Sequence, residues 1–209
     1  NASAVCFTTE EEIRLARKTF WPFDCKQIVT GLGVGDPPAG EVKQKALFKK
    51  KFTTIKGKKL LLYMGRIHPK KGLDLLLTSY VKQAKSEHVL IIAGPINDRC
   101  GYTQKLFRTY NSSRGVLWTG MLEGDLKWGA LRSADAMILP SHQENYGMVV
   151  AEACSVGTPV LITNKVNLYR EILQYDAGFV DNDNQDGVDN LIKKWISGKV
   201  QYKKLHAIN

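Results

Sequence analysis

Two glutamates, Glu144 and Glu152, stand eight positions apart in one short stretch of the chain. Glu144 lies in a polar loop after a short apolar run, and Glu152 falls in the second turn of a helix that we expect to open near Gly147. The free backbone N–H groups at such a helix start favour an anion, and carboxylates accept hydrogen bonds from hydroxyls. The pattern indicates a site for an anionic, hydroxyl-bearing ligand. Alone, it does not exclude a corner whose carboxylates are only solvated.

Basic residues form a second candidate group, directly after the apolar run at residues 60–64. Gly65 and Arg66 come first, and Lys71 follows five positions after Arg66. A guanidinium fork together with an ammonium group provides the bidentate and point-charge contacts that a diphosphate needs. A surface ion pair is the alternative for Arg66 and Lys71. Their shared place in one loop favours the diphosphate.

Apolar runs alternate with helical patterns from about residue 59 onward. This alternation predicts an α/β fold, a Rossmann-like, doubly wound parallel sheet of about six strands with helices on both faces. In such sheets ligands bind at the carboxyl ends of the strands, near a switch in strand order. The loops after the strands must therefore position the site, including Gly94 and Gly120-Met121, where glycine lets backbone approach a ligand. We expect strands over 60–64, 89–93, 116–118, 136–139, 160–162 and 178–180, and helices over 72–85, 102–110, 123–133, 147–155, 167–173 and 188–195.

The first part of the chain has a different pattern. Thr8 or Thr9 can cap a helix with an acidic first turn, and a brief strand is expected over 27–30. The glycine-rich run after that strand does not match G-x-G-x-x-G, because its third glycine would be Asp36 and two prolines follow. We therefore interpret residues 1–38 as the end of an N-terminal domain and a linker, and residues 39–209 as the ligand-binding domain.

Composition limits the possible partners. The 209 residues carry a net charge of +10, and eight lysines fall between Lys43 and Lys59. Because no nucleic-acid module is recognisable, a solvated face is favoured over a polyanion site, and no nucleic-acid partner is expected. The four cysteines are far apart, as is typical of reduced thiols in a cytoplasmic protein. No run reaches the ~20 apolar residues that a membrane span requires.

No metal site is expected. The four histidines lack H-x-x-x-H spacing. The run from Asp181 to Gly187 fails the calcium-loop pattern, since neither register supplies the glutamate at position 12, and it is interpreted as a turn before the last helix. For His142, which has no visible partner in the sequence, a neutral or surface role is favoured.

The two motifs together resemble the donor-binding half of a family 4, retaining, GT-B-fold glycosyltransferase, and the similarity covers about residues 59–195. The residues that carry it are Gly65-Arg66-Ile67-His68-Pro69-Lys70-Lys71-Gly72, Pro140-Ser141-His142-Gln143-Glu144-Asn145-Tyr146-Gly147, Glu152-Ala153 and Gly157-Thr158-Pro159-Val160.

The resemblance assigns a role to each group. It implies that Arg66 and Lys71 hold the donor diphosphate, that Glu144 contacts the hydroxyls of the donor sugar, and that Glu152 binds the ribose hydroxyls. The remaining implied donor-binding residues are Gly65, Gly94, the backbone from Asn145 through Tyr146 and Gly147 to Met148 at the sugar and phosphate, and Gly120 and Met121 near the nucleobase. Glu144, Arg66 and Lys71 would be the catalytic groups.

The implied reaction is transfer of a hexose, with retention, from a UDP- or GDP-linked donor to a glycan, lipid or polysaccharide acceptor, with no cofactor and no metal. An N-terminal domain would hold most of the acceptor, so these 209 residues alone should bind donor weakly or moderately without full turnover. The expected location is cytoplasmic, and the expected process is polysaccharide biosynthesis. The lysine-rich face is a candidate for peripheral contact with the inner face of a membrane.

Other functions stay open at this point. One is a non-catalytic module that binds a nucleotide or a polyanion. The other is a GT-B-fold nucleotide-sugar epimerase or phosphorylase, which the paired motifs disfavour.

Overall fold

The main body of the protein is one parallel sheet with helices on both faces. The computed structural model describes residues 3–96 and 101–203. The six strands lie in the order β5-β4-β3-β6-β7-β8, every pairing parallel. Their bounds are β3 (Lys59–Met64), β4 (His88–Ala93), β5 (Val116–Trp118), β6 (Ala136–Leu139), β7 (Val160–Thr163) and β8 (Gly178–Asp181). The fold class and all six strands expected from the sequence are confirmed.

The central strands are buried on both faces, which explains their continuous apolar runs. Only 0–1% of the surface is exposed for Leu61, Leu62, Leu90, Ile91 and the whole of β6.

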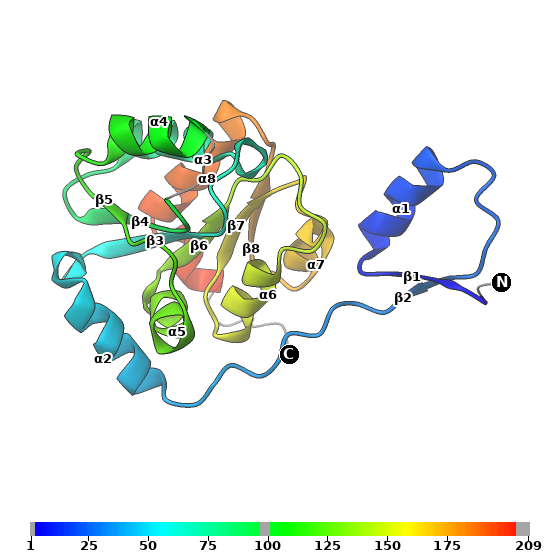
Figure 1. The fold of residues 1–209 in the computed structure, drawn as a ribbon, viewed down its shortest axis with the longest axis horizontal. Helices are drawn as coiled ribbons and strands as arrows, with labels where there is room; N and C mark the ends of the chain where they lie inside the picture. The colour runs from blue at the N-terminus through cyan, green and yellow to red at the C-terminus, as the bar shows by residue number, and fades with distance from the viewer. Residues whose placement is uncertain (1–2, 97–100, 204–209) are drawn as a thin grey trace.

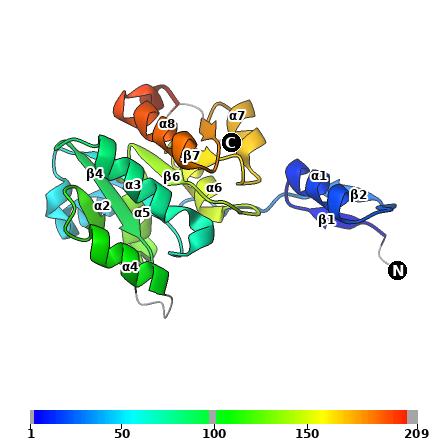
Figure 2. The ribbon, with the colours of Figure 1, turned by 90° about the horizontal axis from the view of Figure 1, so that it is seen from above.

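The helices cover both faces of this sheet. Helix α3 packs against α8 on one side of the sheet, and α5 contacts both α2 and α6 on the other (Figures 1 and 2). The helix bounds are α2 (Glu41–Lys51), α3 (Leu73–Gln83), α4 (Gly101–Tyr110), α5 (Gly124–Ser133), α6 (Met148–Ser155), α7 (Tyr169–Gln174) and α8 (Gln185–Ile196).

The strand order contains one switch point. Counted from β3, the sheet runs third, second, first, fourth, fifth, sixth, which is the order of dinucleotide-binding folds. The chain leaves β3 toward β4 on one side and later returns to place β6 on the other side of β3. The loops after β3 and β6 therefore open into the same crevice, and these are the two loops that carry the sequence motifs.

Helix α2 was not predicted, because its sequence offers little helical periodicity. The segment is rich in lysine, and the residues that it buries are Gln44 and Phe48. It lies along α5, where Gly129 leaves room for its backbone. A Cβ at Gly129 would stand 2.3 Å from the Gln44 carbonyl oxygen. The close contact of the two helices thus depends on a residue 85 positions away from Gln44, which local sequence patterns cannot show.

The N-terminal residues form a small unit beside the main sheet. Strands β1 (Val5–Phe7) and β2 (Gln27–Val29) pair with each other in parallel, with α1 (Glu10–Thr19) between them (Figure 1). Thr9 caps α1 as predicted, its hydroxyl oxygen accepting from the Glu12 backbone N–H at 3.1 Å. Residues 31–38 contain no helix or strand, and they link this unit to the segment before α2.

Glu11 links this unit to the main body. Its carboxylate accepts hydrogen bonds from Arg14 on the same helix and, at 3.1 Å, from Nε of Arg170 in α7. Hydrogen bonds from the two guanidinium groups, Arg14 first, lower the pKa of Glu11 to about 2 although burial opposes them. The carboxylate is therefore ionised throughout the neutral range, and the ion pair with Arg170 persists there.

We predict that Gly129→Ala destabilises the fold. Alanine favours helices, but here its methyl group would press on the Gln44 carbonyl, and such overpacking costs about 1–3 kcal/mol. Gly33→Ala is the matched control, because a Cβ there meets nothing within 4 Å. Urea unfolding should show a lower midpoint for Gly129→Ala alone. Equal midpoints for the two variants would contradict the assigned α2–α5 contact.

Candidate nucleotide-sugar site

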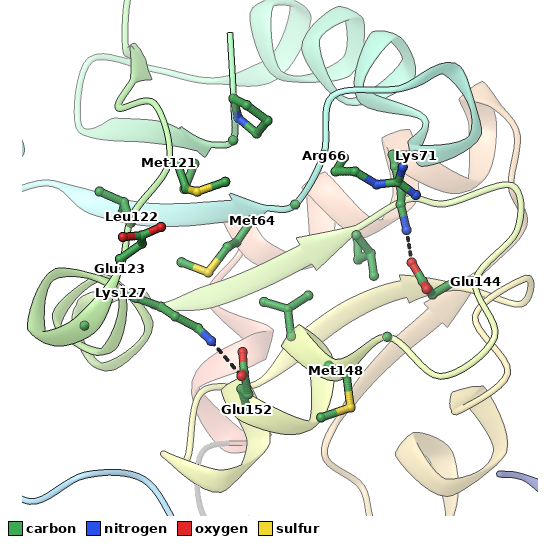
Figure 3. A pocket seen from close by; sticks show the side chains of 18 residues that line it. Met64, Arg66, Lys71, Met121, Leu122, Glu123, Lys127, Glu144, Met148 and Glu152 are labelled. Carbon is green, nitrogen blue, oxygen red and sulfur yellow. Dashed lines mark hydrogen bonds and ion pairs between the residues drawn. The ribbon is translucent and has the colours of Figure 1, made fainter. Parts of the chain in front are cut away.

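A cavity of about 690 Å³ lies at the switch point of the sheet (Figure 3). Its walls come from the ends of β3, β4 and β6, from the segment before α5, and from α6. The lining residues are Met64, Gly65, Arg66, Lys71, Ala93, Gly94, Pro95, Met121, Leu122, Glu123, Gly124, Lys127, Leu139, Glu144, Gly147, Met148, Val149 and Glu152. The two sequence motifs therefore meet in one space.

A buried tyrosine anchors the backbone of the loop after β3. The Tyr63 hydroxyl donates to the Arg66 carbonyl oxygen at 2.7 Å, and burial of that hydroxyl raises its pKa. Beyond Arg66 the chain makes a short 3-10 turn (Pro69–Lys71), and His68 Nδ1 accepts from the Lys70 N–H at 3.2 Å. These bonds hold the backbone that carries Arg66 and Lys71 at the cavity.

The loops after β3 and β6 are packed directly on each other. Gly72 adopts a left-handed conformation, with φ of 62°, where a Cβ would stand 2.1 Å from the Pro140 carbonyl oxygen. The His142 N–H donates to the Lys70 carbonyl at 2.8 Å. Only glycine permits this approach of the two backbones. The spacing between the basic loop and the acidic loop is thus fixed by main-chain contacts.

Backbone hydrogen bonds hold Glu144 against the loop after β7. Its N–H donates to the Lys165 carbonyl and its carbonyl accepts from the Asn167 N–H, each at 3.0 Å. Its carboxylate pairs with the ammonium group of Lys71, and both side chains are mostly buried. One predicted sugar-binding carboxylate and one predicted phosphate-binding cation are therefore already in contact.

Glu152 has a partner that the sequence analysis missed. Nζ of Lys127 in α5 lies 2.6 Å from Oε1 of Glu152 in α6 (Figure 3). Glu123 lines the same end of the cavity (Figure 3). Since 25 positions separate Lys127 from Glu152, no local spacing could have paired them. The sequence predicted a helix over residues 123–133, but it did not predict the direction in which the Lys127 side chain points.

Nine of the twelve predicted site residues line the cavity. They are Gly65, Arg66, Lys71, Gly94, Met121, Glu144, Gly147, Met148 and Glu152. Gly120, Asn145 and Tyr146 do not. Asn145 lines two neighbouring cavities together with Glu144, and Tyr146 donates from its hydroxyl to the Leu32 carbonyl of the linker at 2.8 Å.

The charged side chains that the structure describes in the cavity are balanced in number. They are three cations, Arg66, Lys71 and Lys127, and three carboxylates, Glu123, Glu144 and Glu152. Two of the carboxylates have ion-pair partners at opposite ends of the cavity. Within residues 3–96 and 101–203, no carboxylate pairs with Arg66, so its guanidinium is available to an anionic ligand.

A smaller cavity of about 310 Å³ adjoins the first at Glu144. It lies between α1 and the loops after β6 and β7, and polar side chains including Arg14, His142, Asn145 and Asn164 line it.

His142 has a partner that the sequence could not show, since its Nδ1 lies 3.1 Å from Oδ2 of Asp183. In the part of the chain that the structure describes, no three His, Cys, Asp or Glu residues converge as metal ligands.

Comparison with known proteins identifies the family. The family model of glycosyl transferases group 1 matches residues 44–209, which include both motifs and the whole sheet. The chain belongs to this family. Its resemblance to glycosyltransferases is thereby confirmed, as is the GT-B type of α/β fold.

Relatives and solved structures agree with this assignment. An uncharacterized glycosyltransferase of Methanocaldococcus jannaschii is 26% identical over 158 residues, which cover 73% of this chain and 40% of that protein. A glycosyltransferase from Rickettsia africae superposes with a TM-score of 0.83 at 16% identity, covering 98% of this chain and 57% of its own. The Anabaena protein HepE, solved in complex with UDP-glucose, gives 0.77 at 14% identity, covering 99% and 57%. The chain thus spans less than two thirds of each of these proteins.

We predict that Tyr63→Phe loosens the loop after β3. The ring stays, but the Arg66 carbonyl loses its donor, at a cost of about 1–2 kcal/mol in unfolding free energy. Hydrogen exchange of the Lys71 and Gly72 amides should become faster than in the wild type. Tyr80→Phe is the control, because the Tyr80 hydroxyl also donates to a carbonyl, that of Gly115 at 2.9 Å, outside the cavity. Equal exchange of the two amides in both variants would refute the anchoring role.

Proposed function

We propose that this chain is the donor-binding domain of a retaining glycosyltransferase that transfers a hexose from a UDP- or GDP-linked donor to a glycan, lipid or polysaccharide acceptor. One observation carries the proposal. The basic loop after β3 and both glutamates of the motif after β6 line a single cavity at the switch point, within a domain of the glycosyl transferases group 1 family. The description of HepE as a UDP-glucose complex supports this choice of donor class.

The charges suggest how a donor would lie. Its diphosphate would contact Arg66, Lys71 and the backbone N–H groups at the start of α6, where Gly147 and Met148 line the cavity. Glu144 would accept hydrogen bonds from the sugar hydroxyls, and Glu152 from the ribose hydroxyls. The nucleobase would lie near Met121, with Gly94 on the neighbouring strand end. Lys71, which pairs with Glu144 in the structure, would then be shared with the diphosphate.

The proposed chemistry is substitution at the anomeric carbon with retention. The bond from this carbon to the diphosphate oxygen breaks, and its electron pair leaves with the nucleotide. The acceptor oxygen forms its new bond on the same face, and its proton passes to the departing diphosphate oxygen on that face. Arg66 and Lys71 stabilise the departing negative charge. Glu144 positions the sugar and stabilises positive charge near it, and the scheme requires neither metal nor cofactor.

The acceptor and the cellular place complete the proposal. Residues 1–38 would be the end of an N-terminal domain and its linker, and residues 39–209 the donor domain. The N-terminal domain would hold most of the acceptor, next to the polar cavity that adjoins Glu144. The enzyme would work in the cytoplasm, in polysaccharide biosynthesis. Within the described residues, no helix has the length and apolar character to cross a membrane.

We predict that the chain binds UDP or GDP through Arg66 and Glu152. Calorimetric titration of UDP, GDP and ADP should show that Arg66→Ala and Glu152→Ala each raise the dissociation constant about tenfold or more, since each removes a hydrogen-bonding charged group. Lys70→Ala is the matched control, because Lys70 belongs to the same loop but does not line the cavity. Absence of binding, or binding unchanged by both substitutions, would exclude the proposed donor site.

Further outcomes separate the alternative functions. Salt-sensitive binding to DNA or anionic vesicles without nucleotide binding would indicate a polyanion-binding module. Incubation of the full-length enzyme with donors and acceptors, followed by NMR of the product, distinguishes the enzymes. A transferred sugar with the anomeric configuration of the donor is expected. A changed donor sugar without an acceptor would identify an epimerase, and an inverted product would contradict retention.

We further propose peripheral contact between the lysine-rich face and an anionic membrane. The exposed lysines of this face include Lys49, Lys50 and Lys51 in the last turn of α2. Replacing these three by glutamine should reduce co-sedimentation with phosphatidylserine vesicles, because each lysine near such a surface contributes about 1 kcal/mol. Lys18, Lys85 and Lys105, which are also exposed, form the charge-matched control. Equal co-sedimentation of both triple variants would exclude this face.

A further inference from the structure

The Lys127–Glu152 pair forms the end of the cavity farther from Arg66 and Lys71 (Figure 3). Lys127 extends from α5 and Glu152 from α6, and the 2.6 Å contact joins the two helices across the cavity wall. The side chains have 27% and 16% of their surface exposed. The pair is therefore partly shielded from water, and its ammonium group stands within reach of any ligand that Glu152 binds.

The contact restricts the carboxylate of Glu152 in a specific way. Lys127 engages Oε1, and no other side chain of the described residues donates to this carboxylate. A carboxylate offers about four lone-pair sites in one plane, of which a single ammonium hydrogen uses one. Because Oε1 is held, rotation of the group is limited and the direction of Oε2 is set. The free lone pairs are thereby arranged before a ligand arrives.

We propose that Lys127 is a positioning residue that determines selectivity for ribonucleotides, by holding Glu152 so that it accepts hydrogen bonds from both ribose hydroxyls. This inference rests on the proposed function, in which Glu152 is the ribose end of the site. A carboxylate without Lys127 must be ordered when the nucleotide binds, and that ordering offsets the gain from each hydroxyl. Preference for ribose over 2′-deoxyribose then falls.

A purely structural role makes a different prediction. The pair could serve only to hold α5 and α6 together, since these two helices are in contact. If the pair only holds the two helices together, its loss would lower thermal stability and weaken the binding of all nucleotides alike. Loss of a positioning residue lowers the affinity for UDP more than the affinity for 2′-deoxy-UDP. The ratio of the two dissociation constants therefore separates the two roles.

The test is calorimetric titration of UDP and 2′-deoxy-UDP into the 209-residue chain. The wild type should prefer UDP by about tenfold or more, because a hydrogen bond to a charged group is at stake. Lys127→Met keeps the length of the side chain and should reduce the preference to about threefold or less. Lys127→Arg keeps the charge and should restore most of it. Lys45→Met is the matched control, since Lys45 pairs with Glu41 at 3.2 Å on the exposed surface of α2.

Several outcomes would overturn the inference. A wild-type preference for UDP in Lys127→Met shows that Lys127 does not position Glu152, whether or not the melting temperature falls. If Lys127→Met does not fold, Lys127→Gln decides, since it also lacks the charge: a lowered preference supports the proposal and an unchanged one refutes it. In a Glu152→Gln background, Lys127→Met should cause no further loss of preference. Failure of the wild type to bind any nucleotide would instead refute the proposed function.

Discussion

The whole site depends on the contact between the loops after β3 and β6. The strand order switches sides between these two parallel strands, so the loops at their carboxyl ends face one crevice. Gly72 then lets the first loop touch the backbone of Pro140 at the start of the second. The Lys71–Glu144 pair follows from this approach, as does the backbone bond from His142 to Lys70. A side chain at position 72 would separate the loops and with them the basic and acidic halves of the cavity.

The second property of the site is that its charges are arranged in advance. Glu144 and Glu152 each have an ammonium partner, one at each end of the cavity, while Arg66 has no carboxylate partner among the described residues. Burying several charges without partners would be costly. Pairing them offsets that cost and fixes the directions of the carboxylates. In the proposed donor complex, a diphosphate would bind to Arg66 and share Lys71 with Glu144, with little rearrangement of the protein.

The N-terminal unit adds a further polar surface beside Glu144. The ionised carboxylate of Glu11 joins α1 to Arg170 of α7, and the linker meets Tyr146 through the Leu32 carbonyl. Glu11 lines the small polar cavity that α1 shares with the loop of Glu144. In the proposed transferase this arrangement would set the acceptor against the sugar end of the donor. The family match covers residues 44–209, so this part of the proposal rests on the contacts alone.

The sequence by itself determined the α/β class, the six strands and half of the described residues that line the cavity, because these depend on local signals. A strand buried on both faces must be apolar throughout, as residues 60–64 are, and the functional loops must follow the strand ends. Tertiary structure alone decided the rest. It packs α2 against Gly129 and directs the Tyr146 hydroxyl to the Leu32 carbonyl. It also pairs His142 with Asp183 and Lys127 with Glu152. Each of these contacts joins segments that periodicity treats separately, and their partners depend on how helices and loops pack in three dimensions.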